Sequence, residues 1–227
     1  YIRWQRSMLE SQAVPLATIK NNLLTFRSVL LEIMPEKTHA LLLTYLGEAM
    51  DNLDEALQSE KSFMDPDNPF LESLKRYLQL LLAAQKEAAV ELVNRKISEG
   101  VAAKDIYLHI LQPAQYEIGR LWQINNISAA EEKIATDITL NAMNRLRERG
   151  KTRNLSPAEG NQKAKTLLSA CIGNELHEID IRIINDYFYL SGWKTIYVGA
   201  NTPPQNMPNL VDRYRPDILA LSVTMHG

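Results

Sequence analysis

The chain has 227 residues, and its 25 Lys and Arg residues nearly balance its 27 Asp and Glu residues, for a formal net charge of −2. This length is enough for one large domain or two ordinary ones, each with its own core. The balance of charge argues against a primary nucleic-acid surface, which normally carries a basic excess.

The single cysteine, Cys171, cannot form an internal disulfide, so a reducing compartment is the simplest expectation. No continuous apolar stretch reaches the roughly 18–20 residues that a membrane span requires. The first residues, YIRWQRSMLESQ, lack the hydrophobic core of a secretory signal. We therefore expect a soluble, cytoplasmic protein.

Residues 1–64 are predicted to form an N-terminal helical segment. Apolar residues recur at helical spacing from Leu16 to about Ile33, and Pro35 separates this helix from a second one. One apolar face of the second helix comprises Leu42, Leu46, Ala49, Leu53 and Ala56. The segment lacks the basic recognition helix of a DNA-binding arm, so we expect a role in oligomerisation or signalling.

Residues 69–150 are predicted to form a four-helix bundle. A run of turn formers at 65–69 precedes four apolar-periodic stretches, at about 70–83, 85–98, 103–121 and 129–148. Gly100 suits a helix end, and Ser128 with Glu131 forms a capping box. Because the connections are short, we expect antiparallel neighbours.

The polar segment 151–162 is typical of an exposed linker, and residues 163–227 then change to an α/β pattern. Three strand-like runs alternate with helical stretches near 181–188 and 205–214; the runs are 166–172, 193–198 and 217–224. This alternation predicts a Rossmann-like, flavodoxin-like parallel sheet, with ligands at the carboxyl ends of its strands. Because a third strand would leave an apolar edge, we expect a domain cut short at Gly227, with about two further strands that follow in the native chain or are supplied in another way.

The loop after the first strand contains the strongest candidate metal ligand. His177 lies at the ligand-binding edge, and Glu175 can accept the second N–H of its imidazole, which would leave the other nitrogen as a donor to a metal. The alternative is that His177 begins the next helix, with Glu175 and Glu178 as acids of its first turn.

The pattern Glu175-x-His177-x-x-Asp180 resembles the cobalamin-binding domain family, whose loop is Asp-x-His-x-x-Gly with the histidine as lower axial cobalt ligand. Ser222-x-Thr224 corresponds to a Ser-x-Leu that lies beside the nucleotide tail in that family. Aspartate at 180 departs from the family's glycine, which leaves room for the tail. A different tetrapyrrole or a loss of binding are the alternatives that this departure leaves open.

The bundle is similar to that of CarH-like cobalamin-dependent photoreceptors, whose signature is Trp, nine residues, then Glu-His. Trp122 is followed by nine residues and then by Glu132 and Lys133. The resemblance implies that Trp122 covers the upper corrin face and that Glu132 contacts the upper ligand. A protonated lysine offers no lone pair, so a bis-histidine product is not expected.

Together these resemblances imply a cobalamin site, with adenosylcobalamin or methylcobalamin as the cofactor. Its metal ligand would be His177, and its cofactor-binding residues would be Trp122, Glu132, Lys133, Gly173, Glu175, Asp180, Ser222 and Thr224. His226 is a weaker candidate at the same edge. His39 and His109 lie in helical patterns, so we expect surface or partly buried histidines and not ligands. Cys171 lies in an apolar strand, so we expect a small core residue.

Three functions follow from this pattern. The first is a cobalamin-binding sensor or transcriptional regulator, with light as one trigger, that is not itself an enzyme and acts through a homo-oligomer or a signalling partner. The second is a corrinoid carrier for methyl transfer. The third is a related scaffold that binds heme or no cofactor.

Overall fold

The computed structural model describes residue 9 and residues 13–54, 62–154 and 165–223. They form two compact units, one from 1–63 with 116–132 and the other from 64–115 with 133–227. The expected division at 1–64, 69–150 and 163–227 stays a prediction.

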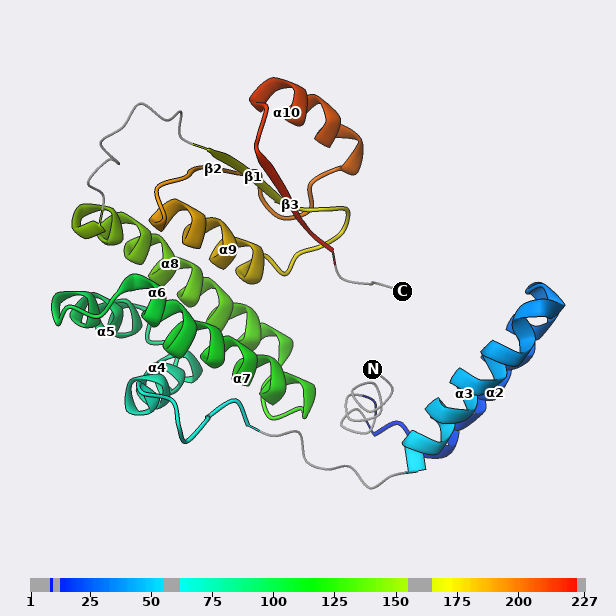
Figure 1. Cartoon of the computed structure of the whole chain (residues 1–227). Helices are drawn as coiled ribbons and strands as arrows, with labels where there is room; N and C mark the ends of the chain where they lie inside the picture. The colour runs from blue at the N-terminus through cyan, green and yellow to red at the C-terminus, as the bar shows by residue number, and fades with distance from the viewer. Residues whose placement is uncertain (1–8, 10–12, 55–61, 155–164, 224–227) are drawn as a thin grey trace. The chain divides into compact units, whose positions relative to one another are not determined.

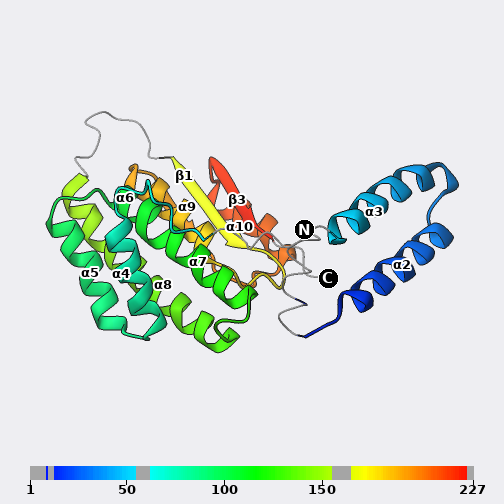
Figure 2. The ribbon, with the colours of Figure 1, turned by 90° about the horizontal axis from the view of Figure 1, so that it is seen from below.

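The first unit begins with two helices that lie side by side, α2 (Leu16–Ile33) and α3 (His39–Asp54) (Figures 1 and 2). Met34 is extended because the residue before a proline is pushed out of the helical region, and Glu36–Thr38 then form a 3₁₀ turn. Ile19 and Leu53 are buried. The predicted apolar face of the second helix is confirmed over its described residues, and Ala56 lies outside them.

The helical bundle consists of four helical stretches, as predicted. The third contains a π-helical turn, and the fourth is longer than predicted. The stretches are α4 (Leu71–Leu82), α5 (Lys86–Ser98), α6 (Ala103–Ile106) continuing through a π-helical turn (Tyr107–Leu111) into α7 (Gln112–Gln123), and α8 (Ala129–Asn154). The prediction of a linker from residue 151 was wrong for Lys151–Asn154, which continue α8. Residues 155–162 lie outside the described chain.

The π-helical turn has a cause in the sequence. Pro113 has no N–H to donate to the carbonyl four residues earlier, that of His109. The Asn68 side-chain amide donates to that carbonyl instead, at 2.8 Å. The helix therefore passes the proline without leaving a backbone acceptor unsatisfied.

The capping box at the start of α8 is confirmed. The Ser128 backbone N–H donates to the Glu131 carboxylate at 2.7 Å, and the Glu131 N–H donates to the Ser128 hydroxyl at 3.2 Å. At the end of α5, Gly100 has φ +93°, a left-handed conformation that a glycine adopts without strain.

The core of the bundle within the second unit is apolar and fully buried. It includes a buried polar group, in which the Tyr77 and Thr139 hydroxyls lie 3.1 Å apart and Gln115 donates to Thr139 at 2.6 Å. Burial raises the pKa of Tyr77, so the phenol stays protonated. The apolar members include Leu74, Leu81, Val93, Ile106, Ile110, Leu111, Met143 and Leu146.

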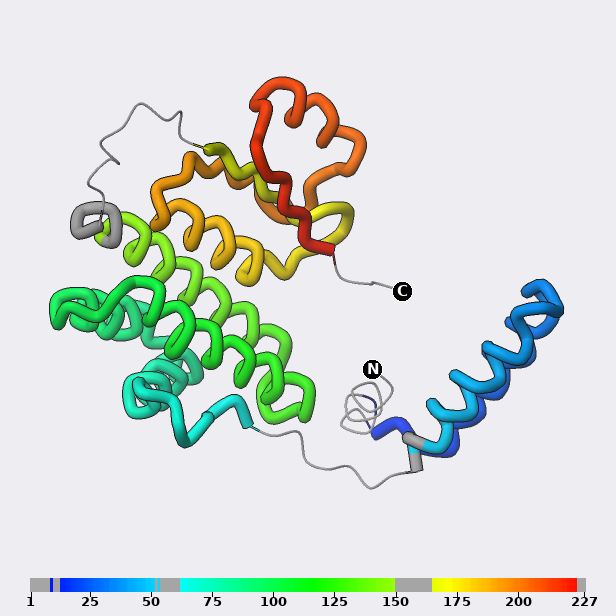
Figure 3. Tube along the Cα trace, viewed as in Figure 1, coloured from blue at the N-terminus to red at the C-terminus, as the bar shows by residue number. Residues whose placement is uncertain are grey.

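The α/β part has a three-stranded parallel sheet in the order β2-β1-β3. The strands are β1 (Thr166–Cys171), β2 (Lys194–Tyr197) and β3 (Ile218–Ser222), and Figure 3 follows the chain between them through α9 (Ile179–Leu190) and α10 (Met207–Tyr214). In Figure 1, α9 and α10 cover opposite faces of the sheet. The predicted fold class, a helical bundle followed by a Rossmann-like parallel sheet, is confirmed.

β3 forms one edge of this sheet. Its Leu219 and Leu221 are 40% and 50% exposed. That further strands continue the sheet stays a prediction.

A buried polar cluster connects the bundle to α9 within the second unit. The Asp186 side chain, 4% exposed, accepts a hydrogen bond from the Tyr107 hydroxyl at 2.7 Å and pairs with the Arg147 guanidinium. Arg147 also donates to Thr195 on β2 at 2.9 Å. Burial raises the pKa of Tyr107, and the Asp186 charge adds to this, so the phenol stays a donor.

Among the described helices, none combines the length and apolar character that crossing a membrane requires.

Candidate functional site

The loop between β1 and α9 lies at the carboxyl edge of the sheet, where parallel sheets bind ligands. It begins with Gly173, whose φ of +64° is left-handed. An added Cβ there would meet nothing within 4 Å. The position therefore favours glycine for its backbone conformation and not for lack of space.

Glu175 and His177 form the pair that the sequence predicted. The Glu175 side chain is 1% exposed, and its Oε1 accepts the backbone N–H of His177 at 2.6 Å and lies 2.7 Å from Nδ1 of the same residue. A carboxylate that accepts from Nδ1 fixes the proton there and leaves the lone pair on Nε2. The His177 side chain itself is 70% exposed.

This donor set suits a transition metal. Metal-binding histidines characteristically donate their second N–H to a carboxylate, which orients the ring and raises its basicity. Glu175 and His177 thus have the chemistry that a metal ligand requires, and the exposed imidazole does not have to leave a packed core to reach a ligand.

Backbone hydrogen bonds to the loop after β2 hold Glu175 in place. The Asn201 N–H donates to the Glu175 carbonyl at 2.9 Å, and the Gly173 N–H donates to the Thr202 carbonyl at the same distance. Thr202 in turn donates its N–H to the Cys171 carbonyl at 2.8 Å. Sequence reasoning missed Asn201 and Thr202 as supports, because their backbone groups and not their side chains make these contacts.

A side-chain hydrogen bond between Tyr197 and Glu178 connects the end of the loop to β2. The Tyr197 hydroxyl donates to Glu178 at 2.6 Å, and the Arg182 guanidinium lies 5.5 Å from the Tyr197 ring. Burial and then the Glu178 contact raise the pKa of Tyr197, so this donor stays protonated. Burial likewise raises the pKa of the Cys171 thiol, and Cys171 lies in the core, as expected.

Of the other cofactor-binding residues predicted in the α/β part, those that the structure describes lie near this loop. Asp180 is an exposed residue of the first turn of α9, and partial desolvation raises its pKa while His177 opposes the shift. Ser222 pairs with Cys171, and its carbonyl accepts the Ile172 N–H at 2.9 Å. Thr224 and His226 lie outside the described residues.

The cofactor-binding residues predicted in the bundle are exposed or half-buried. Trp122, near the end of α7, is 38% exposed, which is unusual for so large an apolar side chain. Glu132 is half-buried and donates its N–H to the Ser128 carbonyl at 3.0 Å, and Lys133 is exposed. That Trp122 faces His177 across a cofactor stays a prediction.

The other two described histidines have structural surroundings. His39 Nε2 lies 2.9 Å from the Met34 carbonyl oxygen, and the His109 ring centroid lies 5.9 Å from that of Phe70. Both are half-buried, in line with the expectation of partly buried histidines.

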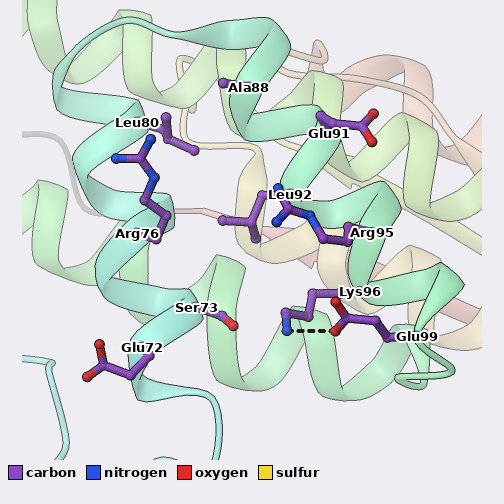
Figure 4. A pocket seen from close by; sticks show the side chains of 10 residues that line it. All are labelled: Glu72, Ser73, Arg76, Leu80, Ala88, Glu91, Leu92, Arg95, Lys96 and Glu99. Atoms are coloured by element: carbon purple, nitrogen blue, oxygen red, sulfur yellow. Dashed lines mark hydrogen bonds and ion pairs between the residues drawn. The ribbon is translucent and has the colours of Figure 1, made fainter.

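Two hollows lie away from His177. An open one of about 500 Å³ follows β2 and is lined by Val198, Ala200, Asn201, Thr202, Pro203, Asn206, Asn209 and Leu210. The other, of about 380 Å³, is a groove between α4 and α5 (Figure 4). Arg76 of α4 and Arg95 of α5 lie on opposite sides of this groove, and Lys96 pairs with Glu99 at 2.7 Å. Only the first hollow shares residues, Asn201 and Thr202, with the loop contacts described above.

The chain is similar to known proteins that bind corrinoids. Residues 73–147 match the model of the B12 binding domain family. No curated protein matches the chain. The chain is similar to the monomethylamine corrinoid protein of Methanosarcina barkeri, with 16% identity over 67% of this chain and 68% of that one and a TM-score of 0.55.

Two further likenesses are weaker in shape. A methanol:cobalamin methyltransferase complex from Methanosarcina barkeri has 16% identity, coverage of 87% and 69%, and a TM-score of 0.39. A cobalamin-binding protein from Desulfitobacterium hafniense has 19% identity, coverage of 67% and 69%, and a TM-score of 0.35. The first likeness shows the fold, and the family match supports cobalamin binding. The match to the B12 binding domain family covers residues 73–147, which form the helical bundle, and not the α/β part.

Proposed function

We propose that this chain is a corrinoid protein that carries a cobalamin for methyl transfer, with His177 as the lower axial ligand. The observation that carries the proposal is the Glu175–His177 pair at the carboxyl edge of the sheet, in a chain whose bundle matches the B12 binding domain family. A bound corrinoid would supply a cobalt centre that can carry an alkyl group.

The protein's part on the side of His177 would be to hold an oriented imidazole. Glu175 fixes the Nδ1 proton, and its buried negative charge favours electron donation from Nε2. The backbone bonds from Asn201 and Thr202 keep the loop from shifting. Gly173 and Ser222 line the same edge, where they would lie beside the cofactor's tail.

The resemblance to the CarH-like bundle implies that Trp122 and Glu132 would contact the upper side of the cofactor. An exposed indole near a helix end has the flat apolar surface needed to cover the upper face and exclude water from it. Lys133 carries a positive charge and offers no lone pair, so it would act as an electrostatic neighbour and not as a cobalt ligand. Asp180, where the cobalamin-binding family has glycine, would make the tail take a different path.

Two functions share this site. The likeness in fold to a monomethylamine corrinoid protein supports the carrier. The Trp122-x9-Glu132 spacing favours the second candidate, a CarH-like sensor in which loss of an adenosyl group, for example by light, changes the contacts of the bundle. The carrier requires a partner methyltransferase, whereas the sensor requires a signalling partner.

The binding test is to load the full chain with hydroxocobalamin, methylcobalamin, adenosylcobalamin or heme and to record absorption spectra. We expect cobalamin bands that shift in His177→Ala, with His109→Ala as the matched control. A protein that takes up heme and no cobalamin, or a His177→Ala spectrum identical to that of the wild type, would refute the site.

A second experiment separates the carrier from the sensor. The methylcobalamin form is mixed with a corrinoid methyltransferase, and the adenosylcobalamin form is illuminated while its hydrodynamic size is followed. Loss of the methyl group to the enzyme's acceptor supports the carrier. A change of size under light without methyl transfer would replace the carrier with the sensor.

A further inference from the structure

The helices α2 and α3 expose an unusual amount of apolar surface. Eight large apolar side chains of this hairpin are at least 38% exposed: Leu24, Phe26, Val29, Ile33, Met34, Leu41, Leu43 and Tyr45. In α4 and α5, by contrast, Leu82 is the one large apolar side chain that is exposed among the described residues. The hairpin therefore does not have the surface of an ordinary solvated helix pair.

The exposed side chains form stripes. On α2, Phe26, Val29 and Ile33 have the spacing i, i+3, i+7 and are 53%, 46% and 67% exposed. On α3, Leu41 and Tyr45 have the spacing i, i+4 and are 60% and 64% exposed. Residues at these spacings share one helix face, so each helix presents a continuous apolar line.

These stripes are additional to the face that the two helices already share. On α3 the half-buried or buried line includes Leu42, Leu46 and Leu53, and the line of Leu41 and Tyr45 lies next to it. A helix with one neighbour needs one stripe, whereas a helix in a four-helix bundle contacts two neighbours and needs a wider apolar face. The hairpin thus has the pattern of half a four-helix bundle.

The charges indicate which hairpin completes that bundle. α2 carries Lys20 and Arg27 with one acid, Glu32, whereas α3 carries the acids Glu48 and Asp51. A twofold association that places α2 of one copy against α3 of the other brings a basic helix against an acidic one at both contacts, as α2 and α3 already do within one hairpin. The surface is self-complementary in both polarity and charge.

We propose that α2 and α3 pair with the same helices of a second copy of this chain, forming an intermolecular four-helix bundle. Burial of the exposed stripes would remove on the order of 600 Å² per copy, so about 1,200 Å² in total, which is the lower end for a specific interface. This inference is independent of corrinoid binding, because no residue of the proposed cofactor site takes part.

The test is sedimentation of the full chain over a range of concentrations. We expect a species of twice the 25.8 kDa chain mass, and a dissociation constant raised at least about 100-fold in Phe26→Glu/Tyr45→Glu, because each change puts a charge into the apolar contact. Leu82→Glu, at a 44% exposed position of α4, is the control and should keep the wild-type mass.

Far-UV circular dichroism and cobalamin spectra are recorded for every variant, so that unfolding or loss of cofactor is recognised separately. If Phe26→Glu/Tyr45→Glu unfolds, the single change Ile33→Glu replaces it. A wild-type chain that stays monomeric at about 100 µM overturns the proposal, since the stripes would then be covered within one chain or by a different protein. Stripe variants with the wild-type mass overturn it as well.

Discussion

Replacement of Asp186 by asparagine tests how much the contact between the bundle and α9 contributes to the free energy of unfolding. The carboxylate is buried, pairs with Arg147 and accepts a hydrogen bond from Tyr107. Asp186→Asn keeps the volume of the side chain but removes its charge, so the Arg147 guanidinium is left without its ionic partner.

The magnitude follows from the burial of the two partners. Breaking a fully buried ion pair costs roughly 3–5 kcal/mol. The Arg147 side chain is 30% exposed, so water partly compensates for the loss, and we expect a decrease in the free energy of unfolding of about 2–3 kcal/mol. Tyr107→Phe removes one hydrogen bond to a charged group and should cost about 1.5 kcal/mol.

The assay is urea unfolding of the full chain followed by far-UV circular dichroism, with both single variants and the double variant. Because Tyr107 and Asp186 touch, the double variant should lose less than the sum of the two, by about 1 kcal/mol. The exposed pair Lys86–Asp137 also joins α8 to another element, so Lys86→Ala is the control and should cost less than about 1 kcal/mol. An Asp186→Asn effect no larger than that of Lys86→Ala would refute this reasoning.

Three further predictions concern single residues. Burial alone would raise the pKa of Glu117, but hydrogen bonds from Arg120, Phe63 and Ser62 hold it below its usual 4.5. The contribution of Glu117 to stability should therefore be present above pH 4.5 and be lost as the pH falls further. A Glu117→Gln variant that keeps the wild-type acid unfolding curve would contradict this. Trp122→Ala should weaken adenosylcobalamin roughly tenfold more than hydroxocobalamin in a titration, because the indole is proposed to cover the upper ligand, and equal losses would count against that role. Asp180→Gly should tighten cobalamin binding if the carboxylate obstructs the tail; an unchanged dissociation constant would mean that Asp180 points away from it.

Features with a local cause were predictable from the sequence. The Ser128–Glu131 capping box, the apolar face of α3 and the Glu175–His177 contact each involve residues a few positions apart. In such cases the backbone geometry of a helix or a tight loop brings the side chains together with little help from the rest of the fold.

Features assembled from distant segments were not predictable in this way. The cluster of Tyr107, Arg147, Asp186 and Thr195 draws on four elements, and no spacing in the sequence reveals it. The extension of α8 through Lys151–Asn154 was missed because a polar segment without an apolar stripe is typical of a linker, whereas Lys and Arg are also good helix formers.

The π-helical turn is an intermediate case. Pro113 within a helical pattern is itself a signal of a distorted helix, but the compensating donor, Asn68, lies 41 positions from His109, the residue whose carbonyl it satisfies. The position of Trp122 relative to His177 likewise cannot be derived from local sequence, since it depends on how separate parts of the chain pack.

The most direct test of the central claim is electron paramagnetic resonance of the cobalamin-loaded chain with its cobalt reduced to the paramagnetic divalent state. Coordination by a histidine nitrogen splits the cobalt lines, and the splitting pattern changes when the protein is prepared with nitrogen-15 histidine. We expect that change in the wild type and its loss in His177→Ala. A splitting pattern in the wild type that is the same with either nitrogen isotope would show that the nitrogen on cobalt does not come from the protein's histidines, and that His177 is not the ligand.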